Sequence, residues 1–257
     1  MMSRRKRASD VDLRGLVADK LTWLRLPGMA SALEDVLEQA SADNLGALEA
    51  ISRLCDEEKA SRLRSAVKRR IKAARFPEVN TIDGYDFDYC AKRRKLRARY
   101  LALHDLDFLS KGINPLFIGS PGTGKTFLSR ALAYRACTAN KRVVTASAMK
   151  MLNELHAADV HGNIERALRK YERADLLVID DFAVLEMDAG QAKLAFQVIS
   201  ERYEHRRSTA ITTNRPFKEW TKVFPDALNA QIVAERLTDH AEVFNLLNSK
   251  SYRIKRD

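Results

Sequence analysis

Gly119-Ser120-Pro121-Gly122-Thr123-Gly124-Lys125-Thr126 is the stretch that decides how this chain folds, and it satisfies the phosphate-binding pattern G-x-x-x-x-G-K-[ST] at every position. The apolar segment Pro115–Ile118 precedes it, and apolar residues recur at helical spacing from Phe127 onward. A strand, a glycine turn and a helix N-terminus in this order direct backbone N–H groups and the positive end of a helix dipole at a polyphosphate. The stretch therefore predicts a nucleotide site that extends from Gly119 to Phe127.

Single residues within this stretch have distinct expected roles. Gly122 and Gly124 let the backbone curl where a Cβ atom would clash. We expect Lys125 to reach the β- and γ-phosphates and the Thr126 hydroxyl to bind Mg²⁺. The expected cofactors are therefore ATP and Mg²⁺.

Two further strand ends carry polar residues that suit phosphoryl transfer. The apolar run Leu176–Ile179 ends in Asp180 and Asp181, which is typical of a Walker B element. Asp180 is expected to hold Mg²⁺ opposite Thr126, and Asp181 to orient or deprotonate the attacking water. A later strand ends at Asn214, where a polar side chain would place that water against the γ-phosphate. The alternative for Asn214 is an ordinary turn residue before Arg215-Pro216.

The pattern from residue 113 onward predicts an α/β fold with a five-stranded parallel sheet, because apolar strands alternate with amphipathic helices. The predicted strands are Pro115–Gly119, Lys141–Ala146, Asp175–Asp180, Ser208–Thr213 and Glu242–Leu246. The predicted helices are 126–139, 147–156, 161–173, 189–206 and 228–239. We therefore expect a P-loop ATPase domain over residues 106–257.

The first part of the chain has a different pattern. The pattern of residues 1–76 predicts a small all-helical domain, which ends at Phe76-Pro77. The pattern of residues 77–105 predicts a basic linker with a lead-in helix. Cations gather in both segments with few interleaved acids, which favours contact with phosphate over a merely solvated helix face. The candidate DNA-binding residues are Arg62, Arg64, Lys68, Arg69, Arg70, Lys72, Arg93 and Arg94.

The composition limits the class of protein. The net charge of +11 and the pI near 9.7 point to a polyanionic partner, nucleic acid before membrane. The sequence has no apolar run of about 18 residues, so no membrane span is expected. The basic N-terminus is not followed by an apolar segment, so it is not read as a secretory signal. We expect a cytoplasmic protein that associates with DNA.

Taken together, the motifs resemble the AAA+ ATPases of the initiator and helicase-loader group. The sequence is most similar to the IstB-type helper ATPases of insertion-sequence transposition, and the likeness extends from Leu13 to Arg253. The segments that carry the closer likeness lie outside the ATPase motifs: 24–30, 74–77, 85–87, 235–241 and 251–253.

The resemblance implies further roles. Asn214 would be sensor 1, Arg236 an arginine finger for a neighbouring subunit's ATP site, and Arg253 a sensor 2 arginine without a full C-terminal lid domain. It also implies an extra helix within Ser147–Arg173. The sequence departs from the family at Ala183, where glycine is usual; alanine is expected to be tolerated unless that position needs a positive φ. Asp181 stands where many relatives have glutamate, which leaves the rate of turnover open.

The function that the resemblance implies is an oligomeric ATPase, slow and stimulated by DNA or a partner. It would have ATP sites at subunit interfaces, assemble on and remodel double-stranded DNA, and deliver that DNA to a transposase. The nearest alternative is a replicative helicase loader of the DnaC type, which would prefer single strands. A P-loop kinase and an architectural protein that hardly hydrolyses ATP remain as alternatives from other classes. The adenine pocket carries no motif, and residues near Leu106–Ile113 are the expected location.

Overall fold

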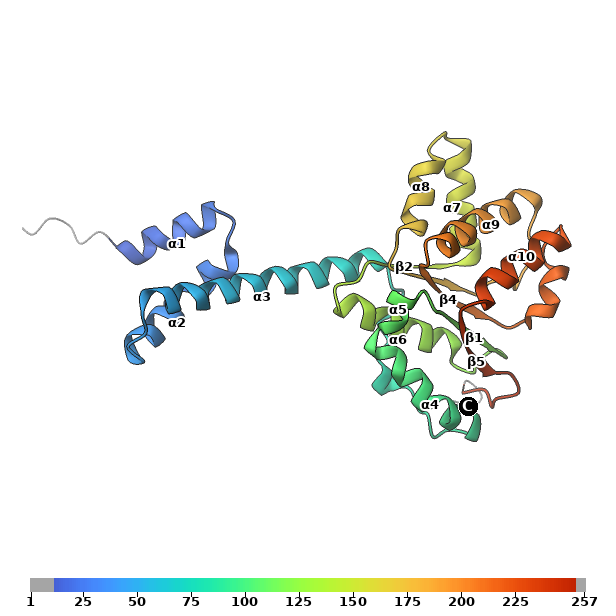
Figure 1. Cartoon of the computed structure of the whole chain (residues 1–257), viewed down its shortest axis with the longest axis horizontal. Coiled ribbons are helices and arrows are strands. Elements are labelled where there is room, and N and C mark those ends of the chain that lie inside the picture. Colours follow the sequence, from blue (N-terminus) through green and yellow to red (C-terminus); the bar gives the residue numbers. More distant parts are fainter. Residues whose placement is uncertain (1–11, 253–257) are drawn as a thin grey trace, which may run out of the picture. The chain divides into compact units, whose positions relative to one another are not determined.

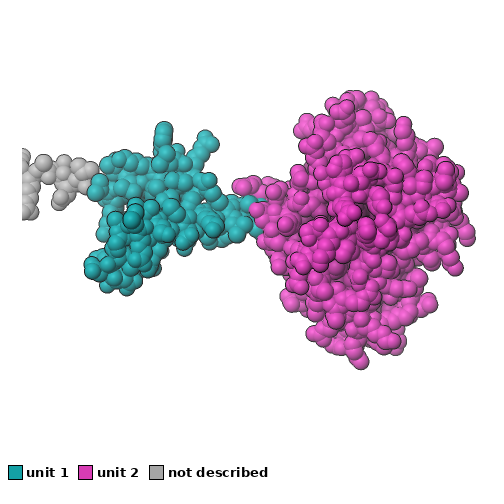
Figure 2. Space-filling view, in the orientation of Figure 1, with its two compact units in different colours: residues 1–68 teal, residues 69–257 magenta. Residues whose placement is uncertain are grey.

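The computed structural model describes residues 12–252, and its contacts divide the chain into two compact units after Lys68 (Figure 2). This division differs from the predicted one, which placed the boundary at residue 76 and made residues 77–105 a linker. Phe87 and Tyr100, from that expected linker, are buried in the core of the second unit. The residues between the predicted domains are therefore part of the ATPase unit, because their apolar side chains have a buried surface to pack against.

The first unit is helical, as predicted. It comprises α1 (Leu13–Trp23), α2 (Pro27–Ala42) and most of α3 (Ala47–Ala74). A small core forms around Leu33, Val36 and Leu54. Glu58 of α3 accepts hydrogen bonds from the backbone N–H groups of Gly28 and Met29, at 2.7 and 3.2 Å, and so satisfies free donors at the start of α2.

The close approach of α2 to α3 requires glycine at position 28. A Cβ atom on Gly28 would lie 2.6 Å from the Glu58 Cα atom, so a larger residue would push the two helices apart. Arg62, one turn after Glu58, donates to its carboxylate at 2.7 Å. This ion pair holds the pKa of Glu58 below its usual value, despite the opposing effect of burial.

The second unit contains the predicted α/β domain. Before the sheet come η1 (Ile82–Gly84), α4 (Ala91–Ala102), η2 (Leu103–Asp105) and α5 (Asp107–Lys111). The strands are β1 (Asn114–Gly119), β2 (Val143–Ser147), β3 (Leu176–Asp180), β4 (Ser208–Thr213) and β5 (Ala241–Leu246). The helices between them are α6 (Lys125–Thr138), α7 (Ala148–Val160), α8 (Ile164–Glu172), α9 (Ala189–Glu204), η3 (Phe217–Lys222) and α10 (Ala227–Thr238).

All five strands pair in parallel, in the order β2-β3-β4-β1-β5. Each strand lies within two residues of its predicted ends. The central strands are buried almost throughout, which explains the continuous apolar run Leu176–Ile179 of β3, whereas β4 buries Ser and Thr side chains as well. Because β4 lies between β1 and β3, the residues that follow these three strands meet at one edge of the sheet.

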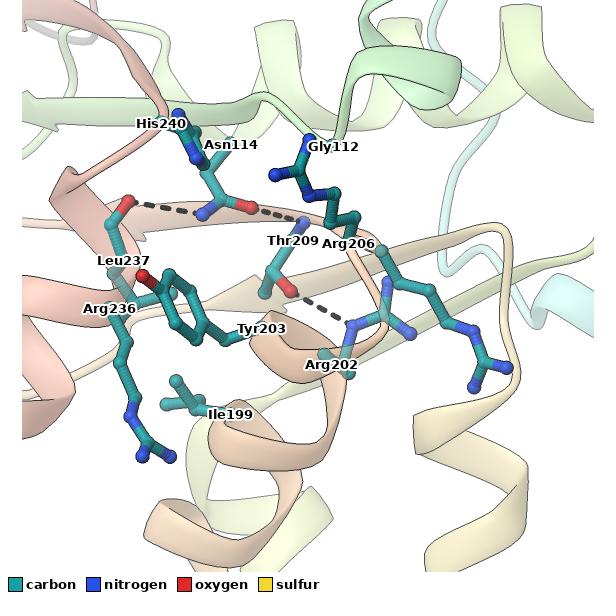
Figure 3. Close-up of a pocket in the computed structure, with 11 residues that line it drawn as sticks. Gly112, Asn114, Ile199, Arg202, Tyr203, Arg206, Thr209, Arg236, Leu237 and His240 are labelled. Atoms are coloured by element: carbon teal, nitrogen blue, oxygen red, sulfur yellow. Dashed lines mark hydrogen bonds between the residues drawn. The ribbon is translucent and has the colours of Figure 1, made fainter.

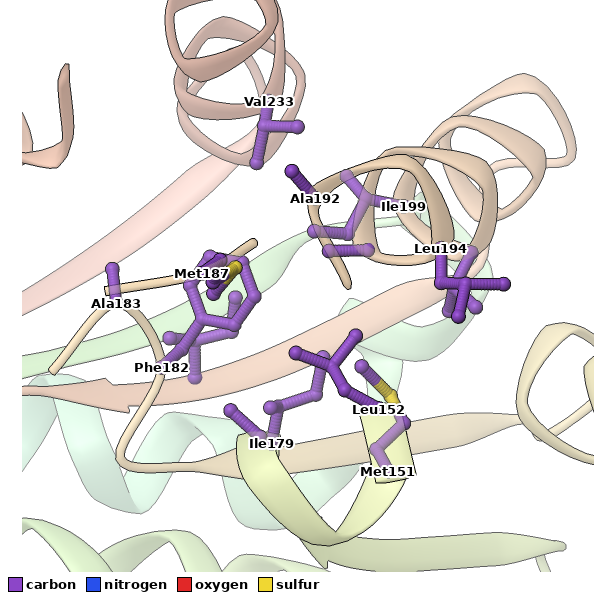
Figure 4. Close-up of a cluster of buried hydrophobic side chains, with 14 of the residues drawn as sticks. Met151, Leu152, Ile179, Phe182, Ala183, Met187, Ala192, Leu194, Ile199 and Val233 are labelled. Atoms are coloured by element: carbon purple, nitrogen blue, oxygen red, sulfur yellow. The ribbon is translucent and has the colours of Figure 1, made fainter. Parts of the chain in front are cut away.

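Helices cover both faces of the sheet (Figure 1). On one face α7, α8, α9 and α10 form a core with η3, and Leu152, Phe182 and Val233 are among its fully buried side chains (Figure 4). On the other face α4 and α6 form a second core with aromatic residues of the sheet, among them Phe117 and Phe244. Two apolar layers of this kind are what a parallel sheet requires.

The buried side chain of Arg202 on α9 links α8 to β4 by hydrogen bonds. It is 1% exposed, and its guanidinium donates to the carbonyls of Tyr171, Glu172 and Ala174 at the end of α8. It also donates to the Thr209 hydroxyl and the Ser208 carbonyl on β4. Burial lowers the pKa of Arg202 to about 9, so the group remains charged at neutral pH. The guanidinium thus pairs carbonyls that the end of α8 would otherwise bury unpaired.

No helix within residues 12–252 has both the length and the apolar character needed to cross a lipid bilayer.

Candidate nucleotide-binding site

The P-loop has the conformation that its sequence predicts. β1 ends at Gly119, the loop turns through Gly122 and Gly124 with φ values of 76° and 95°, and α6 begins at Lys125. Lys125 is 7% exposed, and its ammonium donates to the Ser120 carbonyl at 3.1 Å. The first N–H groups of a helix have no carbonyl partner within it, so the start of α6 faces the loop as an anion-binding end.

Asp180, at the end of β3, faces this loop. The Thr126 hydroxyl donates to its Oδ1 atom at 2.8 Å, and Arg130 lies 3.5 Å from its Oδ2 atom. A hydroxyl and a carboxylate oxygen at this separation fit two ligands of one Mg²⁺ ion, which binds oxygen donors. Residues 12–252 contain no cluster of three or more His, Cys, Asp or Glu side chains suited to a metal. Mg²⁺ usually keeps several waters and binds substrate phosphates, so these would complete the ligand set beside Thr126 and Asp180.

Thr212 is a site residue that the sequence analysis missed. It is fully buried in β4; its hydroxyl donates to Asp180 Oδ1 and accepts from the backbone N–H of Asp181 at 2.9 Å. One hydroxyl therefore positions both acids of the Walker B segment. The available signal was a pair of threonines, Thr212 and Thr213, at the carboxyl end of a strand that is buried throughout.

Asp181 and Ala183 both have a φ of 54°, in the left-handed region. Asp181 tolerates that conformation better than most residues, whereas alanine carries a steric cost of about 1–2 kcal/mol there. The condition under which alanine was expected to be unfavourable at position 183 is therefore met. The turn persists because it is anchored: the Phe182 N–H donates to the Thr212 carbonyl at 2.9 Å, and Phe182 is fully buried.

Asn214 follows β4, between the P-loop and the Walker B strand. Its Oδ1 atom is buried, and the described residues provide no hydrogen-bond partner for it. Asn214 lines the P-loop pocket together with Asp181 and Lys125. Because a buried polar atom without a partner is costly, this position fits a group that pairs with a water or a phosphate in the loaded site.

The pocket has a volume of about 640 Å³, which is large enough for a nucleotide. Residues 78–86 contribute to its lining, whereas Leu106–Ile113, the expected location of the adenine, do not line it. Tyr85 and Phe127 pack against each other in this lining, with ring centroids 5.7 Å apart. A Cβ atom on Gly124 would lie 2.6 Å from the Tyr85 ring, so the loop needs glycine there for space as well as for its φ.

The structure does not bring Arg236 to the P-loop pocket of its own chain. Arg236 lies on α10 beside the amino edge of the sheet, near Asn114 at the start of β1 (Figure 3). Its guanidinium packs over the rings of Phe196 and Tyr203 and lies 3.7 Å from Glu204. The P-loop lies at the opposite edge, so a role for Arg236 in phosphate chemistry requires a neighbouring subunit.

The candidate DNA-binding residues differ in their surroundings. Arg93 is 2% exposed, so its assignment to the DNA-binding surface was wrong. Arg62 and Arg94 are exposed but paired, with Glu58 and Asp88 respectively. The remaining candidates, Arg64, Lys68, Arg69, Arg70 and Lys72, lie along α3 with their side chains wholly or partly exposed. Arg253 lies outside the described residues.

A second basic surface was not predicted. A cavity of about 580 Å³ lies at the amino ends of β2, β3 and β4 and is lined by more cations than acids. Its cations are Arg135, Lys141, Arg142, Arg173, Arg206 and Arg207, and its acids are Asp105, Asp107 and Asp175. The ion pairs of residues 12–252 involve none of these six cations. The cavity adjoins the end of α3, because Arg70 donates to Asn140, next to Lys141.

Comparison with known proteins agrees with this geometry. Residues 19–257 match the model of the IstB-like ATP binding protein family. The insertion sequence IS5376 ATP-binding protein of Geobacillus stearothermophilus is 33% identical over 90% of this chain and 91% of its own. The insertion sequence IS21 ATP-binding protein of Pseudomonas aeruginosa is 30% identical over 91% of this chain and 87% of its own.

Solved structures support the fold. The DnaC helicase loader has a TM-score of 0.58 and 19% identity, and the match covers 65% of this chain and 95% of that one. DnaA from Aquifex aeolicus, solved with the ATP analogue AMPPCP, has a TM-score of 0.55 and 22% identity over 70% of this chain and 54% of its own. These likenesses show that the chain shares the fold of DnaC and DnaA over about two thirds of its length.

Proposed function

Because the chain belongs to the family of IstB-like ATP-binding proteins, we propose that it is an ATP-hydrolysing helper of insertion-sequence transposition. In this proposal the protein assembles as an oligomer on double-stranded DNA, remodels that DNA and delivers it to a transposase. The observation that carries the enzymatic part is the convergence of Lys125, Asp181 and Asn214 on one pocket, beside the Thr126–Asp180 pair.

The chemistry follows from these residues. Lys125 and the N-terminus of α6 bind the phosphates, and Thr126 and Asp180 would hold Mg²⁺, which neutralises charge on the phosphates when bound. Asp181 accepts the proton of the attacking water, and Asn214 orients that water toward the γ-phosphate. Asp181 is one methylene shorter than glutamate, which favours slow turnover.

The oligomer is supported by the position of Arg236. In the isolated chain this guanidinium pairs only loosely with Glu204, and the P-loop lies at the other edge of the sheet. We infer that ATP favours assembly because its γ-phosphate offers Arg236 of a neighbouring subunit a stronger partner. A mixture of Arg236→Ala and Asp181→Ala proteins, each inactive alone, should then recover some ATPase activity. Failure to recover at any mixing ratio would contradict a shared site.

Binding to DNA is supported by the two basic surfaces, the cations of α3 and the cavity at the amino edge of the sheet. Cations without acidic partners repel one another, and a phosphate backbone relieves that repulsion. The testing experiment measures binding to short duplexes and single strands with ATP, ADP or no nucleotide, and then the size of the complexes. We expect ATP-dependent duplex binding in a large, defined assembly.

The same experiment separates the alternatives. Preference for single strands with little assembly on duplex would favour a helicase loader, whereas DNA binding that ignores nucleotide would remove ATP control from the proposal. Lys125→Ala should abolish both ATP binding and ATP-dependent DNA binding, because the ammonium is the principal cation of the phosphate site. A Lys125→Ala protein with a full ATP response would contradict the coupling.

A further inference from the structure

Arg93 lies in a cage of aromatic rings beside the P-loop. Its guanidinium carbon is 4.6 Å from the ring centroid of Tyr85, 4.8 Å from that of Tyr89 and 5.3 Å from that of Tyr252. The guanidinium donates to the Asp86 carbonyl at 3.2 Å and to the Thr123 carbonyl, within the P-loop, at 3.1 Å. A charge this deeply buried needs such partners, so the cage has a defined geometry.

The C-terminal segment closes this cage. The backbone N–H of Tyr252 donates to the carbonyl of Gly122 at 2.9 Å. Tyr89 donates to the Ser251 carbonyl at 2.9 Å, and its ring packs edge-on against that of Tyr252 at 5.2 Å. Residues 85–93 and the segment before residue 253 are thus fastened to each other and to the P-loop.

Two consecutive peptide units of the P-loop are held from outside by these contacts. The Gly122 carbonyl accepts from Tyr252, and the Thr123 carbonyl accepts from Arg93 and, at 3.3 Å, from the Tyr85 hydroxyl. Burial raises the pKa of Tyr85 to about 12, so this hydroxyl keeps its proton at neutral pH.

The orientation of these units bears on phosphate binding. No described peptide bond is cis, and in a planar trans unit the C=O and the following N–H point in opposite directions. With the carbonyls of Gly122 and Thr123 turned to the cage, the N–H groups of Thr123 and Gly124 are turned to the inner side of the loop. Inward N–H groups are what a P-loop presents to a polyphosphate.

We propose that Arg93 and the backbone of Tyr252 are positioning groups for ATP, which hold the Thr123 and Gly124 N–H groups in their phosphate-binding orientation. The proposal rests on the P-loop being the ATP site. It also makes the C-terminal segment part of that site's support, since release of residues 251–252 would free the Gly122–Thr123 peptide to rotate.

The test compares matched substitutions in the full chain. Arg93→Met removes the donors to the Asp86 and Thr123 carbonyls. Lys95→Met is the control, two residues away on α4 with an exposed side chain. Tyr252→Pro removes the N–H donor, whereas Tyr252→Ala keeps that donor and removes only the ring. A fluorescent ATP analogue measures Kd at a temperature where urea unfolding shows every variant to be folded.

We expect Arg93→Met to raise the Kd about tenfold and Lys95→Met to leave it unchanged, with Arg93→Lys intermediate because it keeps one charged donor. Tyr252→Pro should raise the Kd more than Tyr252→Ala. Duplex binding without nucleotide should be the same in Arg93→Met as in wild type, which a DNA-contacting arginine would not allow.

The proposal is overturned if folded Arg93→Met binds the analogue within twofold of wild type. Should that variant fail to fold, equal Kd values for Tyr252→Pro and Tyr252→Ala overturn it instead. Failure of the ATP assignment itself looks different, because wild type and Lys125→Ala would then bind the analogue equally.

Discussion

Thr212→Val is the substitution that best tests how the Walker B acids are held. Valine has nearly the shape of threonine but lacks the hydroxyl, so the buried position stays filled while the hydrogen-bonding group is removed. The change eliminates the hydrogen bond to the Asp180 carboxylate and deprives the Asp181 N–H of its threonine acceptor.

The magnitude follows from the two lost bonds. A hydrogen bond to a charged group contributes about 1.5–3 kcal/mol net, and a buried donor without its acceptor costs about 1–3 kcal/mol. Partial relaxation keeps these terms from adding fully, so we expect the free energy of unfolding to fall by about 2–4 kcal/mol. Urea unfolding of the full chain measures this loss.

The effect on ATP should fall mainly on the rate of hydrolysis. Asp180 keeps Thr126 and Arg130 as partners, so the Kd for ATP should change less than about threefold. Asp181 loses the anchor of its backbone, and a shift of about 1 Å in a reacting group lowers the rate about 100-fold. We therefore expect kcat for phosphate release to fall by about 10- to 100-fold.

Two controls make the result interpretable. Thr212→Ser keeps the hydroxyl and should keep most of the activity. Thr213→Val removes a neighbouring buried hydroxyl whose hydrogen bonds are with the backbone of Arg215 rather than with the two acids. A Thr212→Val protein with the same kcat and stability as Thr213→Val would refute the reasoning.

Two further predictions concern the basic cavity and the first unit. Lys141→Ala combined with Arg142→Ala should weaken duplex binding and reduce the slope of log K against log salt by up to about 2, because each lost phosphate contact removes about 0.9. The charge-matched control is Lys193→Ala combined with Lys218→Ala, two exposed lysines outside the cavity. Equal slopes for the two double variants would exclude the cavity as a DNA-binding surface. Glu58 has a lowered pKa in the folded state, so its contribution to stability is present above its unfolded pKa of about 4.3 and is lost as the pH falls through the folded value. The difference in unfolding free energy between wild type and Glu58→Gln should therefore shrink below about pH 4, and a difference that stays constant with pH would contradict this origin.

The sequence by itself determined the parts of this protein that depend on local patterns. The P-loop, the Asp180-Asp181 strand end and the order of strands and helices could be predicted because each needs only neighbouring residues: a glycine turn, an apolar run, a helical period. The first unit's three helices were predictable for the same reason. The α/β sheet followed from the alternation of these elements.

The tertiary structure alone decided which distant residues meet. The run of cations around Arg93 does not indicate which of its side chains point into solvent and which into the cage formed by residues 85–89 and 252. The burial of Arg93 could therefore not be predicted from the sequence. Thr212 became a site residue because β4 lies beside β3. Arg236 was separated from its own P-loop because α10 returns to the amino edge of the sheet. Strand order and packing set these juxtapositions, and neither is written in any local stretch of the chain.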